Sequence, residues 1–135
     1  MRSSPRDIAL SLARALDHDD YETARRFIAP TCEYELAGTL LRGPDVILAS
    51  YRENSERIRT AMDEVVFESE FEGLDGATAT IRFSDRIRKG TESYTYQCRQ
   101  KYTIEGIHVV KIVNEELPGE RDKANAFMAR VGVVL

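Results

Sequence analysis

The sequence predicts an α+β domain shaped like a cone. We expect a strongly curved, mixed or antiparallel sheet whose concave face is covered by N-terminal helices, and a helix at the C-terminus. Two short helical segments precede a strand, which Gly43-Pro44 joins to a third helix. Long segments of alternating apolar and polar residues follow, and a last helical segment begins after Pro118-Gly119. A cone of this kind can enclose a cavity for a small molecule.

The composition predicts one globular domain, residues 1–135, without a nucleic-acid partner. A chain of 135 residues can bury a single core, and its net charge of −4 provides no basic surface for nucleic acid or an anionic membrane. Residues 1–30 contain no unbroken apolar run, so we expect a cytoplasmic protein without a signal peptide or a membrane span. Cys32 and Cys98 lie far apart in apolar strands, which favours reduced core thiols.

Two helices are predicted before the first strand. In the first, Ser4 is the N-cap, Pro5 takes the first helical position, Asp7 reaches back to the cap and the helix ends near Asp17. Its apolar side carries Ile8, Leu12, Ala15 and Leu16. The second is expected to start from Asp19 as N-cap, with Glu22 three residues later, and to stop at Pro30 after burying Ala24, Phe27 and Ile28.

Two further helices frame the sheet segments. One starts at Pro44 and places a partly polar stripe at helical spacing: Ile47, Tyr51, Asn54 or Ser55, and Ile58. The other follows Pro118-Gly119 and ends at Gly132, with Ala124, Phe127, Met128 and Val131 on its apolar side.

The first hairpin is expected to pair its apolar faces with each other. Val65, Phe67, Ser69 and Phe71 share one face, and Ala79, Ile81, Phe83, Asp85 and Ile87 share the matching one. A three-residue loop, Leu74 to Gly76, pairs Phe67 with Phe83, whereas a two-residue Asp75-Gly76 turn would place Phe71 opposite Thr80. We prefer the three-residue loop, which also sets Glu68 opposite Arg82 and Glu64 opposite Arg86 on a solvated or subunit-facing side.

Asp85 is the unusual residue of the second hairpin. A two-residue turn at Lys89-Gly90 pairs Asp85 with Tyr94, Phe83 with Tyr96 and Ile81 with Cys98. The alternation therefore places a carboxylate on the apolar face, beside a phenol. A buried carboxylate has to be hydrogen-bonded or neutralised, so Asp85 is a candidate general base with Tyr94 beside it. The alternative is a structural role, in which Asp85 reaches water at the end of the strand or caps the turn.

The last strand, residues 107–117, has two possible registers. A tight Glu105-Gly106 turn places Val109, Val113 and Glu115 on the tyrosine face and turns Lys111 inward. A bulge reverses this and directs His108, Val110, Ile112, Asn114 and Glu116 inward. We favour the bulged register because it leaves Lys111 in solvent.

Several chemistries have no support in the sequence. The two histidines, His18 and His108, lie on different elements without metal-ligand spacing, so we expect no metal site and no cofactor. Pro44 stands where the lysine of a phosphate-binding loop would be, and a dinucleotide-binding glycine motif is absent.

The order of these elements resembles the SnoaL-like branch of the nuclear transport factor 2-like superfamily. The resemblance rests on the two helices, the Cys32-Glu33-Tyr34-Glu35 strand, the Gly43-Pro44-Asp45 helix start, three long strands and the Leu117-Pro118-Gly119-Glu120 ending. It implies the fold, a homodimer packed sheet to sheet, and activities that range from polyketide cyclase and ketosteroid isomerase to binding without catalysis. The isomerase residue set and an Asp-Arg-Asp epoxide hydrolase set do not map onto this sequence.

The predicted cavity defines the candidate site. We predict catalytic roles for Asp85 and Tyr94, and ligand contacts for Tyr34, Tyr51, Asn54, Phe67, Phe83, Tyr96, Cys98 and Asn114. One hypothesis is a lyase, isomerase or cyclase acting on a hydrophobic carbonyl compound, with Asp85 abstracting a proton and Tyr94 or Tyr34 stabilising the oxyanion. The alternatives are a protein that binds a small apolar molecule without turnover, and a dimeric association module with a cavity filled by side chains.

Overall fold

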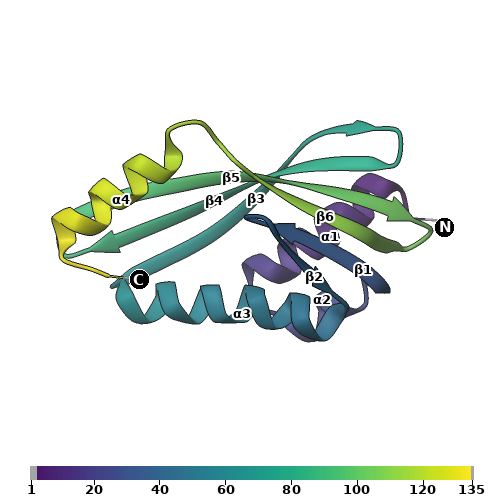
Figure 1. The fold of residues 1–135 in the computed structure, drawn as a ribbon, viewed down its shortest axis with the longest axis horizontal. Helices are drawn as coiled ribbons and strands as arrows, with labels where there is room; N and C mark the ends of the chain where they lie inside the picture. Colours follow the sequence, from purple (N-terminus) through teal and green to yellow (C-terminus); the bar gives the residue numbers. More distant parts are fainter. Residues whose placement is uncertain (1–2, 135) are drawn as a thin grey trace.

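The computed structural model describes residues 3–134, which form four helices and one six-stranded sheet (Figure 1). The helices and strands follow in the order α1 Pro5–Asp17, α2 Tyr21–Arg25, β1 Ile28–Leu36, β2 Thr39–Arg42, α3 Pro44–Ala61, β3 Glu64–Asp75, β4 Thr78–Lys89, β5 Glu92–Glu105, β6 His108–Glu116 and α4 Glu120–Val131.

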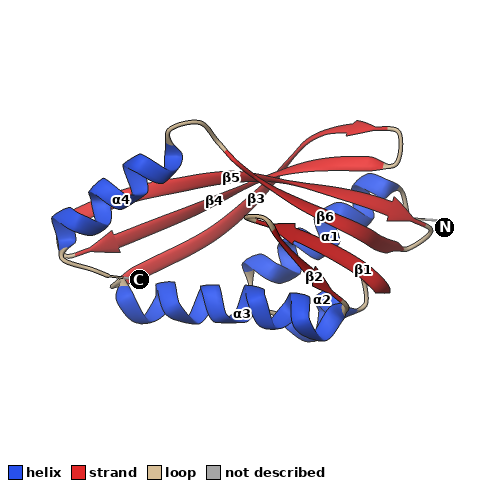
Figure 2. Ribbon diagram, viewed as in Figure 1, coloured by secondary structure: helices blue, strands red, loops and turns tan. Residues whose placement is uncertain are grey.

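The predicted α+β fold class is confirmed. The strand order is β2-β1-β6-β5-β4-β3, in which β1 and β6 are parallel and all other neighbours are antiparallel. Figure 2 shows the long strands twisting across one another, with α1 and α3 on one side of the sheet and α4 beside β5 at one end. The sheet is therefore mixed, curved and open.

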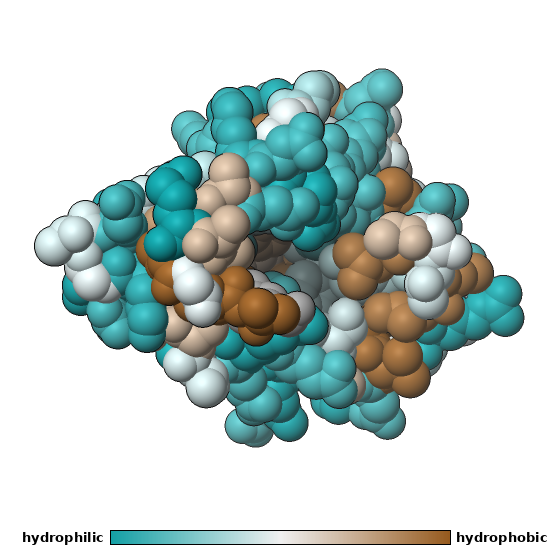
Figure 3. Space-filling view, turned by 60° about the vertical axis from the view of Figure 1, so that its left-hand side comes forward, coloured by the Kyte–Doolittle hydropathy of each residue, from teal (hydrophilic) through white to brown (hydrophobic). Residues whose placement is uncertain are grey.

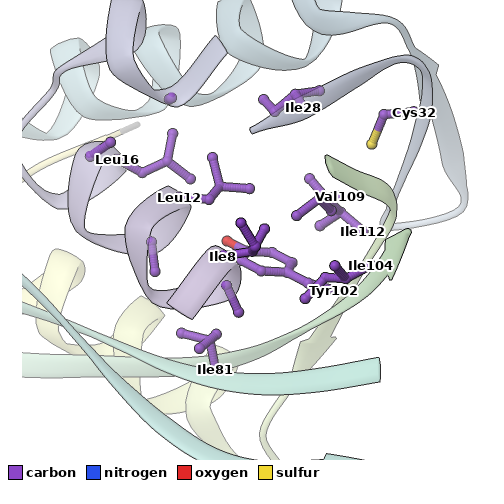
Figure 4. Close-up of a cluster of buried hydrophobic side chains, with 14 of the residues drawn as sticks. Ile8, Leu12, Leu16, Ile28, Cys32, Ile81, Tyr102, Ile104, Val109 and Ile112 are labelled. Atoms are coloured by element: carbon purple, nitrogen blue, oxygen red, sulfur yellow. The ribbon is translucent and has the colours of Figure 1, made fainter. Parts of the chain in front are cut away.

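The first helix supplies much of the main core. Ser4 accepts a hydrogen bond from the backbone N–H of Asp7 and donates its own N–H to the Asp7 carboxylate, which completes the predicted capping box. The buried side of α1 packs against Ile81, Tyr102 and Ile112 of the sheet (Figure 4). Tyr102 is completely buried, so its hydroxyl needs a partner inside the protein.

The prediction for the second helix is wrong at both ends. Asp20, not Asp19, is the N-cap and accepts a hydrogen bond from the Thr23 N–H. Asp19 has φ = 55°, and its carboxylate bonds Ser55 and Arg59 instead of capping this helix. The helix ends at Arg25, and Pro30 lies inside β1, where the pairing with β6 shifts register between Ile28 and Glu33. A proline is tolerated where the ladder is irregular, because its missing N–H is not needed there.

The predicted register of the β3–β4 hairpin is also wrong. Phe67 pairs with Asp85, and Ser69, not Phe67, pairs with Phe83. The strands continue to the Asp75–Thr78 pair, which leaves a two-residue turn, and a bulge between Phe71 and Gly73 adds the residue that shifts the register.

The outer face of this hairpin changes its pairs accordingly. Glu68 lies opposite Ser84 and forms its ion pair with Arg86, and Glu64 lies opposite Arg88. Arg82 bonds Glu72 at 2.8 Å instead of Glu68. The prediction that acidic and basic rows share this face holds, although each pair is displaced.

The turn between β4 and β5 lies one residue later than predicted. Lys89 pairs with Glu92, so the turn is Gly90-Thr91 and the partner of Asp85 is Tyr96. Tyr94 instead pairs with Ile87, and Cys98 pairs with Phe83. Gly90 has φ = 61°, a conformation that glycine adopts without strain.

The bulged register of the last strand is confirmed. Ile104 pairs with Val109 and Thr103 with Lys111, so Val110 is the extra residue. Beyond the bulge, Ile112, Asn114 and Glu116 lie opposite Tyr102, Gln100 and Cys98. Before the bulge the buried side chain is Val109 rather than the predicted His108, which is half-buried opposite Glu105.

The helices at Pro44 and after Pro118-Gly119 form as predicted. α4 ends at Gly132, which has φ = 71° and caps the helix in the left-handed conformation. Among the described residues, no helix is both long enough and apolar enough to cross a membrane.

Candidate functional site

A cavity of about 360 Å³ lies between the sheet, α3 and α4. Figure 3 shows the opening of the cavity as a hollow near the middle of the view, with hydrophobic surface beside it. Every residue predicted for the site lines this cavity: Tyr34, Tyr51, Asn54, Phe67, Phe83, Asp85, Tyr94, Tyr96, Cys98 and Asn114. The structure therefore brings the predicted residues together, and their functional roles stay predictions.

Asp85 is the acidic group of the inner sheet surface. It lies on β4 between Phe67 of β3 and Tyr96 of β5. Burial raises the pKa of its carboxyl to about 7, and the negative charge of Asp17 adds to this effect. A carboxyl with this pKa is partly protonated at neutral pH and can either take up or release a proton.

Tyr96, rather than Tyr94, is the phenol beside Asp85. Burial raises the pKa of Tyr96 to about 12, so its hydroxyl remains a proton donor at neutral pH. The Tyr94 hydroxyl donates to the Glu120 carboxylate at 2.5 Å, and its ring stacks on Phe127 with centroids 5.6 Å apart. Tyr94 thus holds α4 on the sheet.

Asp17 is a site residue that the sequence reasoning missed. It ends α1, lines the cavity and accepts a hydrogen bond from the Ser69 hydroxyl at 2.6 Å. Burial raises its pKa, and the Ser69 bond works in the opposite direction. Its position at a helix end gave no signal, because only the packing of α1 across β3 turns it toward the cavity.

Gln100 is the second missed residue and the centre of a hydrogen-bond network. It is 4% exposed. Its Oε1 accepts from the hydroxyls of Tyr51 at 2.7 Å and Tyr102 at 3.2 Å, and its Nε2 donates to the Tyr34 oxygen at 2.9 Å and to Asn114 Oδ1 at 3.2 Å. A signal did exist, since Gln100 continues the inner alternation of Tyr96, Cys98 and Tyr102.

A polar cluster around Asp19 supports the mouth of the cavity. The Asp19 carboxylate accepts hydrogen bonds from Tyr21 at 3.0 Å, Ser55 at 2.7 Å and the Arg59 Nε at 2.8 Å. Ser55 is therefore the buried member of the predicted Asn54-or-Ser55 pair, and Asn54 is exposed at the opening. The cluster fixes α3 against the loop between α1 and α2.

Two of the remaining wall residues are cationic. Arg57 and Arg121 come from α3 and α4, and Arg121 is paired with Glu116. The wall also carries the thiol of Cys98. Burial and the nearby carboxylates of Asp85 and Glu116 raise its pKa to about 12, so it is protonated at neutral pH. Within residues 3–134, no group of three or more His, Cys, Asp or Glu side chains has a metal-binding arrangement.

The comparisons with known proteins identify the fold. No protein-family profile matches this sequence, and no curated protein sequence matches it significantly. A candidate SnoaL-like polyketide cyclase from Shewanella putrefaciens CN-32 is similar in structure, with 12% identity, a TM-score of 0.69 and coverage of 96% of this chain and 99% of its own.

Two further structures are similar to a comparable degree. TerC, co-crystallised with polyporic acid, is 12% identical, with a TM-score of 0.68 and coverage of 93% of this chain and 99% of its own. An LEH-like epoxide hydrolase from M. tuberculosis is 16% identical, with a TM-score of 0.65 and coverage of 92% and 88%. Identities this low show a shared fold and leave the chemistry open. This chain therefore has the nuclear transport factor 2-like fold, in the form found in SnoaL-like proteins.

Proposed function

We propose that this protein binds a small, mainly apolar carbonyl compound in its cavity and acts on it as a lyase, isomerase or cyclase. Asp85 takes a proton from the carbon next to the carbonyl, and the electron pair of that C–H bond moves toward the carbonyl oxygen. The Tyr96 hydroxyl donates a hydrogen bond to the developing oxyanion. Asp85 then returns the proton to another atom of the same molecule or to a leaving group.

The observation that carries this proposal is the position of Asp85. A carboxyl of pKa about 7 lies on the wall of a cavity lined largely by aromatic and aliphatic side chains. Acids with a shifted pKa are common at functional sites in such cavities, because a group whose pKa is near the working pH can both accept and donate a proton. The similarity to a candidate polyketide cyclase and to TerC is consistent with it.

The test is a thermal-shift screen of apolar ketones, quinones, lactones and sterols, followed by turnover assays on each hit. A ligand at one hundred times its Kd should add about 2.7 kcal/mol to the free energy of unfolding. Asp85→Asn should retain ligand binding and lose at least a hundredfold in kcat. Asp75→Asn, an exposed aspartate at the β3–β4 turn, is the matched control and should behave like the wild type.

The outcomes separate the alternatives. If Asp85→Asn leaves kcat unchanged for a substrate that is turned over, Asp85 is not the base. Binding without any reaction would favour a non-catalytic ligand-binding protein, for which the Gln100 network provides a built, unreactive wall.

A further inference from the structure

We propose that the cavity is polar at two opposite ends and accepts an elongated, flat ligand, with an anchoring carbonyl oxygen, distinct from the reacting carbonyl, at one end and an acidic hydroxyl or C–H group facing Asp85 at the other. This inference rests on the proposed role of Asp85 as the acceptor end. It adds a donor end, formed by Tyr34 and Asn114. The two ends together define the class of substrate.

The donor end is created by the saturation of Gln100. Its amide has one oxygen and two N–H groups. The oxygen already accepts from Tyr51 and Tyr102, and the nitrogen already donates to Tyr34 and Asn114. Gln100 therefore has no capacity left for a ligand and acts on the site through its partners.

The direction of the Gln100 amide follows from its buried partners. Tyr102 is completely buried, and its hydroxyl proton needs an acceptor. The Tyr51 hydroxyl proton also needs an acceptor, and it is donated to the same Gln100 oxygen. The reversed amide would point N–H groups at both hydroxyls and remove the oxygen that accepts their protons, so the observed orientation is the favourable one.

This orientation leaves two donors for a ligand. The Tyr34 oxygen accepts from Gln100, so its own proton remains to be donated. Asn114 uses its oxygen to accept from Gln100, so its NH₂ group remains as well. Both side chains line the cavity. Within residues 3–134 the Asn114 NH₂ donates to no other side chain, and the Tyr34 hydroxyl, which also contacts Tyr51, can turn its proton toward a ligand. Two convergent donors match the lone pairs of a carbonyl oxygen.

The two ends are too far apart to contact the same atom. Asp85 lies opposite Tyr96 and Asn114 lies opposite Gln100, on the two strands that flank β5. Four residues along β5 correspond to about 13 Å, and two strand spacings to about 10 Å. After both side chains reach inward, the groups are separated by on the order of 10 Å.

The wall between the two ends is apolar and aromatic. The paired residues Phe83 and Cys98 lie between the levels of Asp85 and Asn114. Tyr34 and Tyr51 stack with ring centroids 5.2 Å apart and a 17° interplanar angle, which presents flat surfaces to the cavity. An aromatic ketone with a distant acidic group satisfies the donors, the apolar middle and the carboxyl together.

The experiment compares three matched probes by isothermal titration calorimetry: 4-acetyl-4′-hydroxybiphenyl, 4-acetylbiphenyl and 4-hydroxybiphenyl. The first spans both ends, and each of the others lacks one polar group. We expect the bifunctional compound to bind at least tenfold more tightly than either of the others.

The variants separate the two ends. Asn114→Asp keeps the oxygen that accepts from Gln100 and replaces the donor NH₂ with an acceptor. It should weaken both acetyl compounds at least tenfold and change 4-hydroxybiphenyl less than twofold. Tyr34→Phe, which adds no charge, should act in the same direction. Asp85→Asn should weaken only the two hydroxyl compounds, and circular dichroism spectra should show that each variant is folded.

Three results would overturn the inference: no binding of any probe at 1 mM, equal affinity for all three, or an equal loss for all three in Asn114→Asp. The outcome also separates this inference from the proposed function. If Asp85→Asn acts selectively while Asn114→Asp does not, the donor end fails and the role of Asp85 stands. If Asn114→Asp acts selectively while Asp85→Asn does not, the donor end stands and the role of Asp85 fails.

Discussion

At the scale of single residues, Asp85 shows how an alternation pattern can locate an acid without locating its partner. Its place in the β4 alternation predicted an inward carboxylate, and the structure puts it on the cavity wall with a raised pKa. Its partner depends on where the β4–β5 turn closes, and a shift of one turn residue replaced Tyr94 with Tyr96.

The raised pKa of Asp85 predicts a pH-dependent stability. Between the unfolded value of 3.8 and the folded value of about 7, the folded protein binds a proton that the unfolded chain has lost. Stability therefore falls as pH rises through this window and stays low above it. Asp85→Asn removes the group, so the variant should be more stable than the wild type by about 1–3 kcal/mol at pH 8, because cavity solvation reduces the full linkage.

Urea denaturation at pH 4 and pH 8 measures this difference. The two proteins should have similar unfolding free energies at pH 4, where Asp85 is protonated in the folded state. A gain for Asp85→Asn that is the same at both pH values would contradict a raised pKa at this position.

At the scale of helices and strands, the faces were predictable and the pairings were not. Alternation assigned the inner residues of β3, β4 and β5 correctly. The register of each hairpin depends on bulges, such as those at Glu72 and Val110, which accommodate the curvature of the whole sheet. The last strand was the exception, because the cost of an inward Lys111 favoured the bulged register that the structure has.

The Asp19 cluster predicts that α3 is anchored by the carboxylate of Asp19. Asp19→Ala leaves the buried Ser55 hydroxyl without its acceptor and breaks the Arg59 ion pair. We expect a loss of about 1–3 kcal/mol in the free energy of unfolding, since an orphaned buried donor costs its desolvation. Glu56→Ala, an exposed change on the same helix, should cost less than about 0.5 kcal/mol. Equal losses in urea denaturation would show that the cluster is not an anchor.

At the scale of the whole molecule, the cavity lies between two hydrophobic clusters. The larger one joins α1 to the sheet through residues such as Leu12, Ile81 and Tyr102. The smaller one, Met62, Ile87 and Phe127, closes the end under α4. The molecule is thus stabilised at both ends of the cavity rather than through it, so the cavity can remain open.

This division predicts different responses to truncation in the two clusters. Leu12→Ala should lower the free energy of unfolding by about 2–5 kcal/mol and reduce protection throughout the sheet. Phe127→Ala should chiefly free α4, because the smaller cluster is what attaches this helix to the rest of the molecule and β5 is its main neighbour. Native-state hydrogen exchange should show faster exchange in residues 120–131 with little change in β1. A uniform loss of protection in Phe127→Ala would show that the molecule has one cooperative core.

The sequence by itself determined the local features of this protein: the Ser4 cap, the helix starts at Pro44 and after Gly119, the strand faces and the set of side chains that point inward. These depend on neighbouring residues and on periods of 2 and 3.6, which are written in the chain. Only the tertiary structure decided the hairpin registers, the cap at Asp20, the cavity position of Asp17 and the Gln100 network. The cap passes to Asp20 because Asp19 bonds Ser55 and Arg59, far along the chain. The other features join residues far apart in sequence, such as Tyr34 and Gln100, and they depend on how a curved sheet shifts its bulges to close around helices.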